Sequence, residues 1–172
     1  MLKMTGLILI MTAGAGLGFC SSFALTRRER AMGMLLRMVI YLKGEIRYGN
    51  ASLHDAFGGA ARKLPGEYAA FMKAVAGEMR NNTGQPFGEI FRNCAVQYLD
   101  GIGLTEEERE KFFSLGEHLG YLDLDMQMKQ LELYEQELER SIQELKTEMP
   151  AKKKVYQSLG ILGGILLAVL VW

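Results

Sequence analysis

Residues 152–172 read KKKVYQSLGILGGILLAVLVW, three lysines followed by eighteen residues without a charged side chain. In a helix that rises about 1.5 Å per residue, the uncharged run is roughly 27 Å long, just enough to cross a hydrocarbon core of about 30 Å. A second uncharged run extends from Met4 to Thr26. The two runs predict an N-terminal transmembrane helix over residues 1–26 and a C-terminal one over residues 155–172.

Basic residues flank both runs on the side of the intervening segment, residues 27–154. These membrane-anchoring flanks are Arg27, Arg28, Arg30, Lys152, Lys153 and Lys154. Because Lys/Arg-rich flanks stay on the cytoplasmic side of the cell membrane, we expect residues 27–154 to form a cytoplasmic domain and both termini to lie outside the cytoplasm. A cleaved signal peptide is an alternative for the front run. The arginines directly after that run favour a stop-transfer signal instead.

Glycines four residues apart occur in both apolar runs, as Gly14 with Gly18 and as Gly160 with Gly164. Small residues at this spacing let helix backbones approach closely in lipid. The two spans could therefore pack on each other or on other subunits. Glycine is also simply common in membrane helices, so both interpretations stay open.

The charges balance to a formal net charge of zero, which gives no indication of nucleic-acid binding. They are unevenly placed, however. Six basic and two acidic residues between Arg27 and Arg47 give +4, whereas nine acidic and three basic residues between Glu117 and Glu148 give −6. Opposite charges of this kind can steer a partner, or pair within the chain when the helices lie side by side.

Cys20 and Cys94 form no CxxC motif, so neither a disulfide nor a metal site is expected.

The segment between the runs contains residues that typically start and end helices. It lacks the alternation of apolar and polar residues that is typical of strands. Apolar residues three or four apart predict a helix from Arg27 to Tyr48, which Gly49 and Asn50 end. Later helix starts are marked by capping residues or proline, at Ser52 with Asp55, near Glu67, at Pro86, and at Thr105 with Glu108. The pattern predicts an all-α antiparallel bundle of about six helices.

From Leu124 to Met149 the apolar residues alternate four and three apart, with one gap at Glu135. This spacing predicts a long helix with one narrow apolar seam that includes Leu124. A coiled-coil dimer could use such a seam, but packing within the bundle is favoured. Pro150 predicts a kink or a break after it.

The residues that could act in catalysis or bind a metal do not form a recognisable motif. His54 and His118 each lack a second metal-ligand residue four positions away. Glu106 to Glu108 point in different directions around a helix start, where their negative charges interact favourably with the positive end of the helix dipole. No phosphate-binding loop and no nucleophile elbow occurs. The sequence therefore predicts no cofactor, no metal and no enzymatic activity.

Three segments carry a resemblance to a known family: EIRYG at 45–49 followed by LHDAF at 53–57, FSLGEHLGYLDLDMQ at 113–127, and YQSLG at 156–160. They resemble the signature of the stage III sporulation protein AB family. The resemblance covers the whole chain. One departure is Ala51-Ser52, where the family pattern has Thr-Pro, and a serine starts the helix equally well.

The resemblance implies a membrane component of the mother-cell export machinery in endospore-forming bacteria. The family is related to the cytoplasmic domain of the type II secretion platform protein, an antiparallel helical bundle. Its implied partners are a secretion-type ATPase in the cytoplasm and other membrane subunits of the sporulation channel. Whether the chain forms an oligomer stays open. The implied partner-binding residues are Glu45, Tyr48, Gly49, Gly116, Gly120, Asp123 and Gln127.

Structural roles for these residues stay open as alternatives. The glycines can serve only to end helices, and Asp123 can be the N-cap of the last long helix. For the chain as a whole, the first hypothesis is a non-enzymatic platform subunit that docks the ATPase. The competing hypotheses are a membrane-anchored regulatory adaptor unrelated to export and a membrane enzyme.

Overall fold

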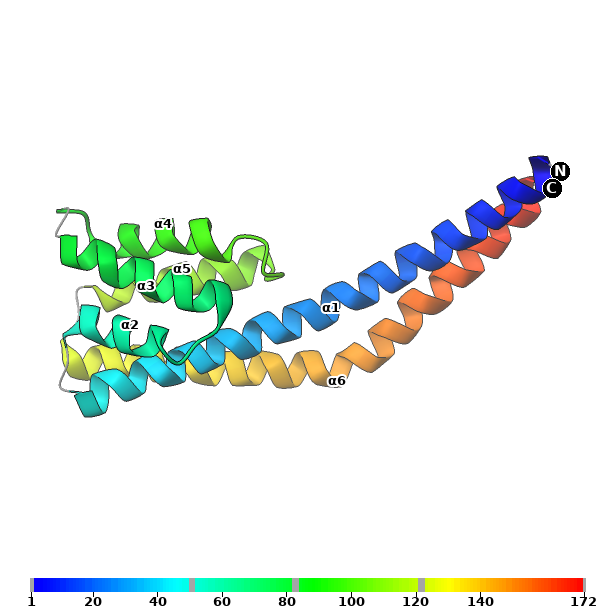
Figure 1. Cartoon of the computed structure of the whole chain (residues 1–172). Helices are drawn as coiled ribbons and strands as arrows, with labels where there is room; N and C mark the ends of the chain where they lie inside the picture. The colour runs from blue at the N-terminus through cyan, green and yellow to red at the C-terminus, as the bar shows by residue number, and fades with distance from the viewer. Residues whose placement is uncertain (1, 50–51, 82–83, 121–122, 172) are drawn as a thin grey trace. The chain divides into compact units, whose positions relative to one another are not determined.

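A computed structural model of the protein describes the backbone of residues 2–49, 52–81, 84–120 and 123–171. It describes the side chains of residues 20, 22–47, 52–81, 84–120, 123–155, 158, 159 and 162. The described backbone forms six helices and no strand (Figure 1): α1 Leu2–Gly49, α2 Leu53–Ala61, α3 Gly66–Asn81, α4 Phe87–Leu99, α5 Glu106–Leu119 and α6 Leu124–Val171. The predicted all-helical fold class is therefore confirmed.

The chain divides into two compact units. Unit 1 comprises Met1–Glu29 and Gln143–Trp172, so it pairs the first part of α1 with the last part of α6. Within it, Lys146 Nζ lies 3.9 Å from Glu29 Oε1. Unit 2 is Arg30–Ile142 and holds the rest of α1 and α6 together with α2 to α5. The domain boundaries predicted after residues 26 and 154 stay a prediction.

Over the residues with described side chains, no helix has both the length and the apolar character needed to span a bilayer. Most of the two apolar runs, and all four of Gly14, Gly18, Gly160 and Gly164, lie outside those residues. The backbone there is helical, and α6 continues through Pro150. A break at Pro150 was one of two expected outcomes and is not observed.

The helix starts follow the capping residues of the sequence. The Ser52 side chain accepts a hydrogen bond from the Asp55 amide at the start of α2. At the start of α5, the Glu108 amide donates to Thr105 Oγ1 over 3.3 Å and the Thr105 amide donates to Glu108 Oε2 over 2.8 Å, a complete capping box. Pro86 is the N-cap residue of α4 and not, as predicted, part of its first turn.

Aromatic side chains form the centre of unit 2. Phe91 from α4 is almost fully buried, and its ring centroid lies 4.8 Å from that of Phe112 and 5.2 Å from that of Phe71. Phe57 and Phe87 extend the cluster on one side, and Tyr134 extends it on the other. Every helix from α2 to α6 therefore contributes a ring, and this shared core holds the short helices against the long ones.

The apolar seam of α6 is buried within its own chain, as packing in a bundle requires. Leu131 and Leu138 are buried, and Tyr134 occupies the place between them that the sequence pattern left as a gap at Glu135. Glu135 lies beside the seam, where its carboxylate pairs with Lys43 of α1. Leu124 was expected in the seam but is 54% exposed, so the seam begins later than predicted.

Candidate functional site

The helices of unit 2 alternate in direction, so α1, α3 and α5 end where α2, α4 and α6 begin (Figure 1). We call this end of unit 2 the junction end. The chain enters unit 2 at Arg30 and leaves it at Ile142, at the opposite end. The predicted partner-binding residues come from two segments, residues 45–49 and 116–127, and both segments lie at the junction end.

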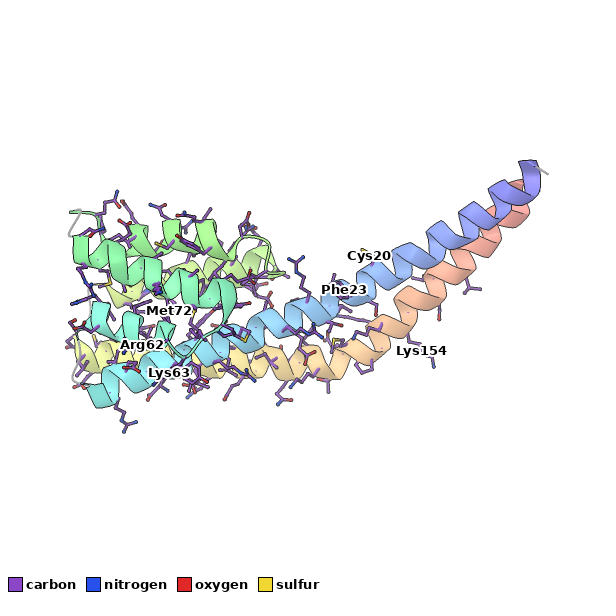
Figure 2. All side chains as sticks on the ribbon, in the orientation of Figure 1. Cys20, Phe23, Arg62, Lys63, Met72 and Lys154 are labelled. Carbon is purple, nitrogen blue, oxygen red and sulfur yellow. The ribbon has the colours of Figure 1, made fainter. Side chains whose placement is uncertain are left out.

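Glu45, near the end of α1, contacts both α2 and the segment that follows α2. Its Oε1 atom lies 2.8 Å from Lys63 Nζ, and both residues remain partly accessible (Figure 2 labels Lys63). The Glu45 carboxylate also lies so close to Gly59 that a β-carbon at that position would collide with it. The side chain of Tyr48 and residue Gly49 lie outside the residues whose surroundings the structure describes.

Gly116 and Gly120 let α5 approach α4 closely. A β-carbon at Gly120 would lie 2.7 Å from Phe87 Cβ, and one at Gly116 would lie 2.9 Å from Phe91 Cβ and closer still to the ring. Gly116 is buried within α5, so close packing and not helix termination explains it. Gly120 is the C-cap residue of α5, and its φ of −75° is open to any residue, so its need for glycine also comes from the contact.

Asp123 and Gln127 build the connection between α5 and α6. The Met126 amide donates to Asp123 Oδ1 over 2.9 Å, which makes Asp123 the N-cap of α6. The Gln127 side-chain amide donates to the carbonyl of Leu119 over 2.9 Å and so satisfies a group at the end of α5. The alternative role considered for Asp123 is therefore confirmed, and its role in partner binding stays a prediction.

The two predicted segments are linked through α2 and α4, although they do not touch in the described contacts. Phe57 of α2 lies 5.7 Å from Phe87 of α4, ring centroid to centroid, and Phe87 contacts Gly120. Sequence reasoning missed Gly59, Lys63 and Phe87 as parts of this arrangement. The Gly58-Gly59 pair inside a predicted helix was the available signal, because glycine weakens a helix unless packing requires it.

Two large apolar side chains are exposed at the junction end. Leu124 is 54% exposed and Met126 is 55% exposed, both in the first turn of α6 next to the Asp123 cap. Val96 is similarly exposed at 52%, but it lies toward the other end of α4. The two residues are two positions apart and so point to different sides of the helix, and each leaves apolar surface accessible at this helix start.

The two histidines serve their own helices. His118 Nδ1 lies 2.6 Å from the Ser114 carbonyl oxygen, one turn earlier, so this nitrogen carries the proton. His54 Nδ1 lies 2.7 Å from Ser52 Oγ at the cap of α2. In the part of the chain that the structure describes, no three histidine, cysteine or acidic side chains gather in a way that could hold a metal ion.

A cavity of about 270 Å³ lies where the loop between α4 and α5 meets the core. Its floor includes Leu99, Ile102 and Phe112, all buried. Arg109 is its one basic lining residue, and the Arg109 guanidinium already pairs with Asp100 at 3.2 Å and with Glu106. These ion pairs raise the Arg109 pKa further. The cavity therefore presents a neutralised charge and no set of convergent catalytic groups.

Burial also raises the pKa of two acidic groups in unit 2. The Cys94 thiol is desolvated and lies near the charge of Glu78, so its pKa is raised and it stays protonated at neutral pH. The Tyr134 hydroxyl is buried near Glu137 and Glu108, and its pKa is raised as well. Neither group belongs to the junction end. A protonated thiol is a poor nucleophile, so Cys94 is a packing residue.

The model of the stage III sporulation protein AB family matches residues 3–172. The chain belongs to this family. Stage III sporulation protein AB of Bacillus subtilis (strain 168) is 28% identical over 170 residues, which cover 99% of each chain. A solved structure of stage III sporulation protein AB is similar in fold, with a TM-score of 0.63 and 24% identity, and the match covers 72% of this chain and 96% of that one.

Proposed function

We propose that this sporulation protein is a non-enzymatic platform subunit whose bundle docks a cytoplasmic secretion-type ATPase through the junction end. In this proposal the apolar runs at 4–26 and 155–172 anchor the chain in the mother-cell membrane that faces the forespore, with unit 2 in the cytoplasm and both termini on the other side. Other membrane subunits of the sporulation channel would surround the anchors.

One observation carries the proposal: two segments some seventy positions apart in the sequence both lie at the junction end. At this end the Gln127 side chain donates a hydrogen bond to the Leu119 carbonyl and Asp123 caps α6, while Glu45 pairs with Lys63 just beyond the far end of α2. Exposed Leu124 and Met126 give this end apolar surface for contact with a large partner. The cavity and the histidines offer no competing catalytic arrangement.

The anchoring part of the proposal rests on the sequence. The basic flanks of both apolar runs border the same segment, which favours one side of the membrane for that segment. Tags at the two termini and in the loop near Asn81 test it through protease accessibility in intact cells. Terminal tags that are protected in cells but cleaved in inverted vesicles would contradict the proposed orientation.

Substitutions at the exposed apolar pair test the docking surface without removing a cap. Leu124→Glu with Met126→Glu places acidic groups in the first turn of α6, where the helix dipole tolerates them, so unit 2 should fold normally. We expect recovery of a secretion-type ATPase with the tagged full chain from sporulating cells to fall about tenfold or more.

Val96→Glu is the matched control, because Val96 is equally exposed but lies away from the junction end. It should leave ATPase recovery unchanged. Unchanged recovery with the Leu124/Met126 variant, in a chain that keeps its helical content and membrane fraction, would remove the junction end from the interface. Equal losses in both variants would show that the effect is not specific to that end.

A further inference from the structure

One side of α1 in unit 2 is an exposed basic stripe. Its members follow one another three and four residues apart, the spacing of one helix face. We call this set the basic face: Arg30, Gly33, Arg37, Ile40, Gly44 and Arg47. Arg30, Arg37, Ile40 and Arg47 are exposed, and no acidic residue belongs to the face.

Among the described residues, nothing packs closely against the glycines of the basic face. A β-carbon at Gly33 or at Gly44 would meet no atom within 4 Å. Glycine inside a helix costs about 1 kcal/mol relative to alanine, so these positions weaken α1 without an internal gain. Between them, Ile40 is 43% exposed. The combination leaves room for another helix to lie close to the α1 backbone.

The exposed side of α6 carries the opposite charge. The acidic face comprises Asp125, Lys129, Glu132, Gln136 and Glu139, which are all exposed and again three or four residues apart. Lys129 is its one basic member. Both faces extend over roughly the same length, about 20 to 25 Å at 1.5 Å per residue.

The two faces lie next to each other on unit 2. Lys43 of α1 pairs with Glu135 of α6 and lies 3.8 Å from Glu132, a member of the acidic face. Lys43 itself directly precedes Gly44 of the basic face. Figure 1 shows α1 and the first part of α6 side by side in unit 2, in opposite directions. The ion pairs of Lys43 therefore mark the line where the basic and acidic faces meet.

We propose that two copies of this chain associate face to face about a two-fold axis parallel to α1 and α6, each basic face resting on the acidic face of the other copy. Such a contact is self-complementary, because each copy carries both faces in the same order. Arg37 lies six residues before Lys43, and Glu139 lies four residues after Glu135, so they are at about the same level of the antiparallel pair. The axis brings Arg37 of one copy onto Glu139 of the other, and Ile40 onto Gln136.

Charge reversal in separate copies tests this pairing directly. Arg37→Glu or Glu139→Arg, present in both copies, places like charges in both contacts. We expect co-purification of two differently tagged full-length copies to fall about tenfold in either case, since two exposed ion pairs are replaced by repulsion. Co-expression of the Arg37→Glu copy with the Glu139→Arg copy restores opposite charges at both contacts, and recovery should return to that of the unmodified chain.

The mixed combination separates association from folding, because a defect within one copy could not be repaired by a second defective copy. The Leu124→Glu/Met126→Glu chain should self-associate normally, which keeps this test independent of ATPase docking. Failure of the mixed copies to recover, or full recovery of either single variant with itself, would overturn the proposal.

Cross-linking fixes the register of the contact. In full-length copies with Cys20→Ser and Cys94→Ala, Ile40→Cys in one copy should link to Gln136→Cys in the other through a short bis-maleimide. Val96→Cys with Gln136→Cys is the matched control and should not link. Stronger linkage between two Ile40→Cys copies than between Ile40→Cys and Gln136→Cys would show that α1 packs on α1, and this arrangement would be wrong.

Discussion

The α4–α5 pair and the α1–α6 pair of unit 2 are held together by different means. Between α4 and α5, Gly116 and Gly120 have no side chain, so Phe91 and Phe87 rest directly on the backbone of α5. Between α1 and α6, the long side chain of Lys43 reaches across to Glu132 and Glu135. The first contact depends on shape, and the second depends in part on charge.

The difference explains how well each helix pair tolerates a change in its side chains. A contact with no β-carbon tolerates no added atom, because protein interiors are packed at nearly crystalline density. A partly exposed ion pair adapts to changes nearby and contributes little by itself. The α4–α5 pair therefore fixes the junction end, while the α1–α6 pair presents charged outer faces to other molecules.

Removing the ring at the centre of the α4–α5 contact should have the largest effect. Phe91 is 1% exposed and packs on Phe71 and Phe112 as well as on Gly116. We expect Phe91→Ala to lower the free energy of unfolding by about 3–5 kcal/mol, measured by urea denaturation of the purified chain. Val96→Ala, in the same helix but exposed, should change it by less than about 0.5 kcal/mol. Equal losses would show that the ring cluster is not the core of unit 2.

Adding one methyl group at the same contact should have a smaller but still clear effect. Gly116→Ala places a β-carbon against Phe91, and we expect a loss of about 1–3 kcal/mol despite the higher helix propensity of alanine. Gly77→Ala in α3 is the matched control, since nothing lies within 4 Å of its added β-carbon. It should stabilise the chain by about 0.5–1 kcal/mol. Stabilisation by both substitutions would show that α5 does not approach α4 as closely as described.

The helix starts could be predicted from sequence because caps are local. Thr105 and Glu108 are three residues apart, and their mutual hydrogen bonds need nothing from the rest of the chain. The same holds for Ser52 with Asp55. The number of helices and the all-α class followed from these signals together with the apolar spacing.

The contacts that build the junction end could not be predicted in this way. Gly116 and Gly120 were singled out by resemblance, but the reason for them lies in Phe91 and Phe87, about thirty positions away. The apolar spacing of α6 placed Leu124 in the seam and left out Tyr134, because spacing does not reveal where neighbouring helices begin to cover a face. Which residues meet is decided by tertiary packing, and the sequence pattern only limits the choices.

Breaking the ion pair of the α1–α6 contact should cost less than changing the α4–α5 contact. Lys43 and Glu135 have side chains that are 19% and 20% exposed. Lys43→Met leaves a partly buried carboxylate without its partner, and we expect a loss of about 1 kcal/mol in urea unfolding. The double variant Lys43→Met/Glu135→Met should lose less than the sum of the single variants. Lys111→Met, which removes more exposed pairs with Glu107 and Glu137, should have little effect.

The last expected effect is absent at neutral pH and appears only at alkaline pH, at the residue where the two pairs meet. Tyr134 of α6 lies 6.3 Å from Phe112 of α5, between ring centroids, and lines a small cavity with Met32 and Leu35 of α1. Burial is the main cause that raises the pKa of its hydroxyl, followed by the charges of Glu137 and Glu108. Above the usual tyrosine pKa of about 10, the unfolded chain has lost this proton while the folded chain keeps it.

The sign of the pH effect follows from that difference. When the folded state binds more protons than the unfolded state, stability falls as pH rises, by at most about 1.4 kcal/mol per pH unit for one group. Tyr134→Phe keeps the ring and removes the titrating group, so its stability between about pH 9.5 and 11 should fall less steeply than that of the unmodified chain. Tyr98→Phe, which removes a hydroxyl at a less buried position, is the matched control. Parallel curves for the unmodified chain and Tyr134→Phe in urea unfolding would show that the hydroxyl titrates normally, and that water reaches the space between α5 and α6 at this residue.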